Sequence, residues 1–246
     1  MKILGIIPAR YESKRFPGKV LADIQGKSMV QRVYEQAIMS NYLDKVVIAT
    51  EDDKVVTHVQ GFGGEVLLTG TNHASGTDRC FEALERQTES YDYVVNIQGD
   101  EPFINPGQID QLAGLLDGTV ELATLIKKIT TADELFNSSE VKTVFNNEME
   151  ALYFSRQPIP YYRNAAELDW LQQQDYYKHI GIYAYRADIL KQISNLPVSK
   201  LEKAESLEQL RWLENGLKIK LAFTEYESVC IDTKEDLAKV LATLME

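Results

Sequence analysis

The segment from residue 8 to residue 19 is rich in groups that bind phosphate. It carries four cations within ten residues, in a chain that is acidic as a whole: Arg10, Lys14, Arg15 and Lys19. Guanidinium and ammonium groups at this spacing could hold a polyphosphate while the loop backbone approaches the ligand. The same cations could instead belong to a solvated surface loop. Position alone gives the two interpretations equal weight.

Two aspartates are candidates for a magnesium site. Asp100 follows an apolar run and lies in a Gly-Asp-Glu-Pro turn, and Asp232 is expected to close the last strand before the final helix. Mg²⁺ usually takes one or two protein carboxylates and leaves its other positions to water and phosphate. Simpler roles exist for both residues, because aspartate stabilises tight turns and a carboxylate is favoured near any helix N-terminus.

Several other chemistries are excluded by spacing. The run Gly26-Lys27-Ser28 resembles the end of a P-loop, but Leu21 stands where that loop needs glycine. A dinucleotide-binding fingerprint would need glycine at position 66, which is Val66. The sequence has no Gly-x-Ser-x-Gly elbow, and its three histidines lack the spacing of zinc ligands. These absences argue against a P-loop ATPase, a dehydrogenase, a zinc hydrolase and a serine hydrolase.

The candidate residues lie at the ends of apolar runs that alternate with helical patterns. In the first half, the expected strands are 2–8, 45–50, 65–69 and 93–98, and the expected helices are 29–40, 52–62 and 77–90. In an open parallel sheet, ligands bind at the carboxyl ends of the strands, where the cationic loop and Asp100 fall. We therefore expect an α/β fold, with a mostly parallel sheet and helices on both faces.

The second half has longer, more polar connections. Its expected strands are 122–129, 141–145, 151–156, 180–186 and 219–226, and its expected helices are 203–215 and 234–245. Residues 157–177 are rich in Tyr, Asn and Gln and predict a less regular arm. A length of 246 residues suits one large domain, so we expect a single domain over 1–246 that includes this arm.

Composition and charge limit the partners. The chain has 26 basic and 37 acidic residues, which gives a net charge of −11. Such a field repels nucleic acid and anionic membrane surfaces, so we expect neither as a partner. No apolar run approaches the length of a membrane span, and the N-terminal run is too short for a signal peptide, so a cytoplasmic location is expected. Cys80 and Cys230 have no CxxC partner and are expected to be reduced core residues.

Seven motifs in order make the chain resemble the 3-deoxy-manno-octulosonate cytidylyltransferases, or CMP-Kdo synthetases. The N-terminal motifs are Ile7-Pro8-Ala9-Arg10 with Arg15-Phe16-Pro17-Gly18-Lys19, His73-Ala74-Ser75-Gly76-Thr77-Asp78-Arg79, and Asn96-Ile97-Gln98-Gly99-Asp100-Glu101-Pro102. The later motifs are Ala151-Leu152-Tyr153-Phe154-Ser155-Arg156, Lys178-His179-Ile180-Gly181-Ile182-Tyr183, Leu207-Glu208-Gln209-Leu210-Arg211, and Asp232-Thr233. The resemblance covers nearly the whole chain.

The resemblance implies a fold and a reaction. The fold would be a Rossmann-like nucleotidyltransferase sheet with a smaller lobe for sugar binding and dimerisation. The reaction would transfer CMP from CTP to the anomeric hydroxyl of the sugar acid Kdo and release pyrophosphate, for lipopolysaccharide biosynthesis. The substrates would then be CTP and Kdo, and the arm would contribute to a homodimer.

The resemblance also implies roles for individual residues. The catalytic group would be Asp100, Asp232, Lys19 and Arg10, with Asp100 and Asp232 as the metal ligands. Two Mg²⁺ ions would act during turnover, the second one on the β- and γ-phosphates. The nucleotide site would comprise Pro8, Ala9, Arg10, Arg15, Lys19, Ala74, Ser75, Gly76 and Asp78. The sugar pocket would comprise Gln98, Arg156, His179, Tyr183, Glu208 and Gln209.

Two alternatives stay open at the level of sequence. One is cytidylyl transfer to another acidic sugar, such as 8-amino-Kdo or a sialic acid, because the motifs describe the sugar pocket only in part. The other is a non-catalytic protein that binds a nucleotide sugar. Loss of either candidate metal ligand would indicate the second alternative, and both Asp100 and Asp232 are present.

Overall fold

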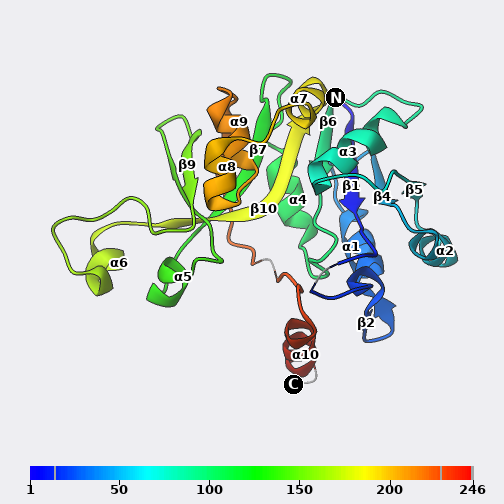
Figure 1. Cartoon of the computed structure of the whole chain (residues 1–246), viewed down its shortest axis with the longest axis horizontal. Coiled ribbons are helices and arrows are strands. Elements are labelled where there is room, and N and C mark those ends of the chain that lie inside the picture. Colours follow the sequence, from blue (N-terminus) through cyan, green and yellow to red (C-terminus); the bar gives the residue numbers. More distant parts are fainter. Residues whose placement is uncertain (14, 228, 245–246) are drawn as a thin grey trace.

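A central sheet runs through the computed structural model, which describes residues 1–13, 15–227 and 229–244 (Figure 1). Within those residues nine strands join this sheet, in the order β11-β7-β10-β6-β1-β4-β5, with β8 paired to β10 and β9 paired to β8. Lys14, one of the four cations of the N-terminal loop, lies outside the described residues. The α/β fold expected from the sequence is confirmed.

The first half of the sheet is parallel. Strand β1 (Ile3–Pro8) runs between β4 (Lys45–Thr50) and β6 (Tyr93–Asn96), and β5 (Val66–Leu68) extends the edge beyond β4. All of β4 after its first residue is buried, and β6 is buried throughout, as expected for strands covered on both faces. Parallel pairing brings the loops that follow these strands to one edge of the sheet.

Strand β10 (Tyr177–Arg186) joins the two halves of the molecule. It pairs antiparallel with β6, β7 (Leu122–Lys128) and β8 (Lys142–Phe145), and the register with β7 shifts between Ile180 and Tyr183. The Thr124 hydroxyl lies 3.0 and 2.7 Å from the carbonyl oxygens of Ile180 and Ile182, so its single O–H supports the irregular backbone by donating to one of them at a time. Strands β9 (Ala151–Ser155) and β11 (Ile219–Phe223) complete this half.

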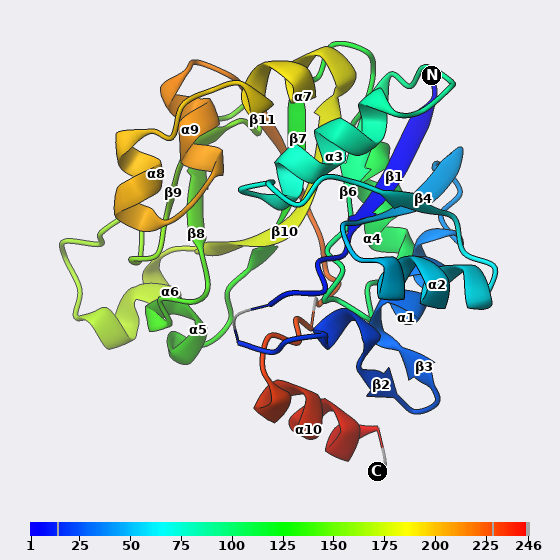
Figure 2. The same cartoon turned by 45° about the vertical axis from the view of Figure 1, so that its right-hand side comes forward.

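Helices pack on both faces of the sheet (Figures 1 and 2). Apolar residues of α1 (Met29–Ala37), α2 (Asp53–Gly61) and α4 (Pro106–Ala113) bury one face. Those of α3 (Gly76–Glu85), α7 (Ala187–Ser194) and α9 (Gln209–Glu214) bury the other. Of the described helices, none is long and apolar enough to span a membrane.

The remaining elements form the periphery. The hairpin of β2 (Asp23–Ile24) and β3 (Lys27–Ser28) packs against α10 (Lys234–Thr243), which lies at the lower end of the molecule in Figure 1. The short helix α6 (Trp170–Gln173) lies within the arm and packs against α5 (Ala132–Phe136), where Trp170 joins Ile129, Leu135 and Tyr176 in a small core. Single 3₁₀ turns cover Lys19–Leu21 and Glu167–Asp169.

Three expectations about the C-terminal third are wrong. The helix expected over 203–215 is two helices, α8 (Lys200–Glu205) and α9, because Ser206 adopts a left-handed backbone with φ of 54°. Asp232 does not close a strand: β11 ends at Phe223, and the described residues before α10, 224–227 and 229–233, have irregular backbone. Cys80 is buried as expected, but Cys230 is exposed because it lies on that irregular segment and not in a strand.

Candidate active site

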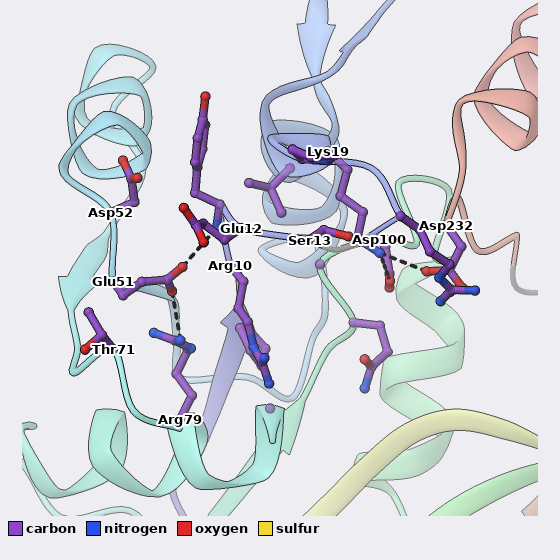
Figure 3. A pocket seen from close by; sticks show the side chains of 18 residues that line it. Arg10, Glu12, Ser13, Lys19, Glu51, Asp52, Thr71, Arg79, Asp100 and Asp232 are labelled. Carbon is purple, nitrogen blue, oxygen red and sulfur yellow. Dashed lines mark hydrogen bonds and ion pairs between the residues drawn. The ribbon is translucent and has the colours of Figure 1, made fainter. Parts of the chain in front are cut away.

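A cavity of about 1050 Å³ opens at the carboxyl ends of the parallel strands (Figure 3). The loop after β1 supplies one wall through residues such as Arg10, Ser13 and Arg15, and the turn after β6 supplies Gln98, Gly99 and Asp100. A Cβ atom at position 99 would stand 2.7 Å from the Pro8 carbonyl oxygen, so glycine is needed for the two loops to approach. The cavity therefore depends on close contact between the first and third motifs.

An ammonium group joins the two candidate metal ligands. Lys19 Nζ lies 2.6 Å from Asp100 Oδ2 and 3.0 Å from Asp232 Oδ1, and Arg15 contacts the other oxygen of Asp232 at 2.8 Å. Burial disfavours the charged form of Lys19, but the two carboxylates outweigh it and raise the pKa of its ammonium. The backbone holds Asp232 here, because Ile231 N–H donates to the Asp100 carbonyl at 2.9 Å.

The donor set at this point fits a magnesium ion. One oxygen each from Asp100 and Asp232, together with Cys230 Sγ, lie within 4.8 Å of one another. Carboxylate oxygens are the hard ligands that Mg²⁺ prefers, whereas a thiol sulfur suits softer metals. Cys230 is exposed as a residue, but the chain around its sulfur excludes part of the water, and this desolvation, followed by the charges of Asp100 and Asp232, raises the pKa of the thiol and keeps it neutral. Asp100 and Asp232 are thus the pair that would hold Mg²⁺.

The nucleotide motif forms the start of α3. Ser75 and Asp78 make a capping box, in which each side chain accepts a hydrogen bond from the other's backbone N–H at 3.2 Å. Arg10 reaches across from the first loop and donates to the Ala74 carbonyl at 3.2 Å. Gly76 lines the main cavity, whereas Ala74 and Asp78 line a smaller neighbouring pocket of about 410 Å³. Ala9 is buried, and its N–H donates to Ala49.

A second group of predicted residues lies beside the α3 N-terminus. Glu208 Oε2 accepts a hydrogen bond from the Thr77 hydroxyl at 2.6 Å. Burial raises the pKa of the Glu208 carboxyl, although the bond from Thr77 opposes the shift. The buried Tyr183 hydroxyl has no hydrogen-bond partner in the described part of the chain, and burial raises its pKa. An unpartnered buried hydroxyl near a partly buried carboxyl is typical of a site that awaits a polar ligand.

Three other residues predicted for the sugar pocket lie on different segments of the chain. The His179 ring lies 5.1 Å from the Tyr183 ring, contacts Thr124 at 3.1 Å, and has a pKa lowered by burial to about 3, so it is neutral. Gln98 donates to the Gly181 carbonyl at 3.0 Å and lines the main cavity. Gln209 is buried at the start of α9.

Arg156 lies apart from this group. Its guanidinium donates to the backbone carbonyls of Glu205, Ser138 and Ser206, at 2.7, 3.0 and 3.3 Å. Three of the five N–H bonds of the guanidinium are therefore engaged, and they hold the β9 end against the α8–α9 turn. Binding of a sugar carboxylate by Arg156 stays a prediction.

Comparison with known proteins places this site in a family. Residues 4–219 match the family described as Cytidylyltransferase. A 3-deoxy-manno-octulosonate cytidylyltransferase from Parabacteroides distasonis is 54% identical over 249 residues, which cover 99% of this chain and 98% of the relative. One from Bacteroides thetaiotaomicron is 53% identical and covers 96% of both chains. This chain belongs to the 3-deoxy-manno-octulosonate cytidylyltransferase family.

Solved structures agree with this membership. A structure of CMP:2-keto-3-deoxy-manno-octonic acid synthetase complexed with CTP is 43% identical, covers 100% of this chain and 99% of its own, and has a TM-score of 0.92. A cytidylyltransferase from Leptospira borgpetersenii shares the fold, with a TM-score of 0.65 at 18% identity. The resemblance drawn from the seven motifs is confirmed, while the individual residue roles stay predictions for this member of the family.

Several residues that line the main cavity were given no role from the sequence, and Glu51 and Arg79 are two of them. Glu51 lies directly after β4, and Arg79 lies in α3, yet both line the cavity. Arg79 belongs to the motif at 73–79, so the sequence indicates that it lies near the site, but not that it pairs with Glu51. A carboxylate at the end of an apolar strand was the signal that could have indicated Glu51.

Proposed function

We infer that this chain is a 3-deoxy-manno-octulosonate cytidylyltransferase, which transfers CMP from CTP to Kdo and releases pyrophosphate. Full-length identity of 54% to such an enzyme and a TM-score of 0.92 to a CTP-bound synthetase support the activity. The structural observation that carries it is the cavity wall formed by Lys19, Asp100 and Asp232, a cation and two carboxylates that converge at the edge of the sheet where the parallel strands end.

The reaction requires little covalent work from the protein. The anomeric oxygen of Kdo forms a bond to the α-phosphorus of CTP, the bond from that phosphorus to the β-phosphate oxygen breaks, and pyrophosphate departs. In such transfers, positioning and neutralisation of charge supply most of the rate acceleration. Arg10, Arg15 and Lys19 reach the cavity as cations and are the residues that would bind the triphosphate.

Asp100 and Asp232 would hold Mg²⁺, which would neutralise phosphate charge and increase the acidity of the attacking hydroxyl. Their carboxylates already converge on one cation, the Lys19 ammonium. A second Mg²⁺ on the β- and γ-phosphates of CTP belongs to the same proposal. The chain's own part is to present two carboxylates whose backbone is tied together by the bond from Ile231 to Asp100.

The sugar would bind beside the α3 N-terminus. Glu208 could accept hydrogen bonds from sugar hydroxyls, and the Tyr183 hydroxyl could donate one, because it has no partner among the described residues. Neutral His179 beside Tyr183 adds a polar edge without charge. Kdo is a polyhydroxylated acid, so its hydroxyls suit these polar side chains and its carboxylate suits the cationic loop.

The cellular setting is also part of the proposal. An acidic chain that resembles this family from end to end is consistent with a cytoplasmic homodimer that supplies CMP-Kdo for lipopolysaccharide biosynthesis. Tyr161 and Leu168 of the arm are 73% and 80% exposed, which suits a surface that a second copy would cover. No nucleic acid or membrane is included as a partner, given the net charge of −11.

Pyrophosphate release with CTP and Mg²⁺ tests the assignment. Kdo, 8-amino-Kdo and N-acetylneuraminate are compared as acceptors, with EDTA in a parallel reaction. Fast, EDTA-sensitive release with Kdo alone is the expected result. Faster release with 8-amino-Kdo or N-acetylneuraminate would keep the chemistry and overturn the choice of sugar. Binding of CTP without release for any acceptor would indicate a protein that binds nucleotide without catalysis.

A further inference from the structure

A buried ion pair lies in the wall of the cavity, opposite Lys19 (Figure 3). Arg79 Nη2 contacts Glu51 Oε2 at 2.8 Å, and the two side chains are 1% and 14% exposed. Burial lowers the pKa of the Arg79 guanidinium, with Glu51 opposing the shift and Arg10 adding to it. A buried pair of this kind often contributes no more stability than apolar side chains of equal volume, so its presence calls for another reason.

The second oxygen of Glu51 holds the phosphate-binding loop. Glu51 Oε1 accepts a hydrogen bond from the Tyr11 N–H at 3.1 Å. Tyr11 directly follows Arg10, and its carbonyl accepts a bond from the Gly18 N–H at 2.8 Å, which closes the loop that carries Arg15. One carboxylate therefore ties the start of this loop to Arg79.

Arg79 in turn holds the nucleotide motif. It belongs to the first turns of α3, whose N-terminus carries Ser75 and Gly76. Its guanidinium also donates to the Thr69 hydroxyl and to the Gly70 carbonyl, on the segment that leads from β5 into the motif. The pair thus links two segments that are more than 50 residues apart in sequence and that both border the cavity.

We propose that Glu51 and Arg79 are positioning residues, which fix the phosphate-binding loop against the nucleotide motif so that both contact CTP together. The inference rests on the proposed function, because it assumes that this cavity takes CTP. Arg79 is almost fully covered, so it acts through Glu51 and its backbone partners and not through contact with the reacting atoms. On the sugar side, His179 and Tyr183 lie on β10 and Gln209 starts α9, while the bond from Thr77 to Glu208 links this side to the helix that carries Arg79.

Shortening Glu51 tests the proposal. In Glu51→Asp the charge beside Arg79 remains, but the carboxylate is drawn back by one methylene, about 1.5 Å, and no longer spans Tyr11 and Arg79. We expect the dissociation constant for CTP, measured by calorimetry, to rise about tenfold or more, since misplacement by about 1 Å can cost that much or more. The KM for Kdo at saturating CTP is expected to change much less than the CTP dissociation constant.

A matched control separates positioning from general loosening. Glu202 and Arg211 form a comparably buried pair, at 12% and 10% exposure, between α8 and α9. Glu202→Asp shortens that pair in the same way and is expected to leave the CTP dissociation constant unchanged. The proposal is overturned if Glu51→Asp binds CTP like the wild type, or if both variants weaken CTP binding equally.

A second variant removes the charges altogether. Glu51→Leu/Arg79→Met replaces the pair with apolar side chains of similar volume, so the melting temperature should remain near that of the wild type. The CTP dissociation constant should still rise, because Tyr11 loses its acceptor. A well-folded double variant with normal CTP affinity would overturn the proposal. Since calorimetry needs no acceptor sugar, a wild type that binds CTP but leaves Kdo unreacted would refute the activity and leave this test intact.

Discussion

Lys19→Met is the substitution whose effect can be worked out most fully from the structure. The ammonium contacts Asp100 at 2.6 Å and Asp232 at 3.0 Å, and its side chain is 14% exposed. At an effective dielectric constant of about 20, each contact carries about 6 kcal/mol of Coulomb attraction, most of which desolvation offsets. Methionine replaces the four-atom stem of lysine but leaves two neighbouring carboxylates without that cation.

The net loss should be smaller than the gross attraction. Removing one partner from a buried ion pair costs about 3–5 kcal/mol. Here Asp100 and Asp232 are 22% and 33% exposed and Arg15 still contacts Asp232, so water and Arg15 should reduce the loss to about 2–3 kcal/mol. In a domain of this size, that corresponds to a melting temperature lower by roughly 4–12 °C.

Magnesium gives the test its specificity. Without the ammonium, Mg²⁺ no longer competes for the two carboxylates, so it should raise the melting temperature of Lys19→Met more than that of the wild type. Turnover should still fall by about 10²–10³-fold, because the variant lacks the Lys19 ammonium that is proposed to bind the triphosphate. Both melting temperatures are measured by calorimetry with and without Mg²⁺.

The control is Lys27→Met, which breaks an exposed pair with Glu35 and should change stability by less than about 0.5 kcal/mol. Two results would refute the reasoning: no destabilisation of Lys19→Met relative to this control, or an equal Mg²⁺-induced shift in Lys19→Met and the wild type. The first would mean that Lys19 does not neutralise the carboxylates. The second would mean that Mg²⁺ binds elsewhere.

Three further predictions concern the other predicted residues. Asp100→Asn should lower kcat at least about 100-fold while the protein stays folded by circular dichroism, and near-normal turnover would remove Asp100 from the metal site. Arg156→Ala should raise the KM for Kdo far more than the KM for CTP, and an equal rise would place Arg156 outside the sugar pocket. The pKa of Glu208 is raised in the folded state, so ionised Glu208 lowers stability once the pH exceeds the ordinary glutamate value. Glu208→Gln should therefore have a larger free energy of unfolding in urea than the wild type at pH 8, and this difference should narrow toward pH 4.5. The KM of the variant for Kdo should rise. A difference in the free energy of unfolding that does not change with pH would contradict this explanation.

The parallel half of the fold could be predicted because its signals are local. Apolar runs such as 45–50 predict buried strands, and the carboxyl ends of parallel strands meet at one edge of the sheet. The cationic loop and Asp100 were therefore expected at a common site, and the cavity confirms that they share one. The family and the reaction were inferred from the seven motifs and their order along the chain.

Other features depend on contacts between distant residues. Asp232 reaches the site through a backbone bond from Ile231 to Asp100, and not as the end of a strand, and no local pattern encodes that bond. The break at Ser206 arises from a left-handed backbone at a residue type that ordinary helices tolerate. The link between Glu51 and Arg79 likewise joins segments 28 residues apart, so each residue alone looked like a surface charge or a helix residue.

The most direct test of the account follows the α-phosphate of CTP. The enzyme is incubated with Kdo, Mg²⁺ and CTP labelled only at the α-phosphorus, and the products are separated and identified by mass. The account predicts that all transferred label appears in CMP-Kdo, that the pyrophosphate is unlabelled, and that Asp100→Asn forms neither product at an appreciable rate. Free labelled CMP without CMP-Kdo, or full activity in Asp100→Asn, would contradict it.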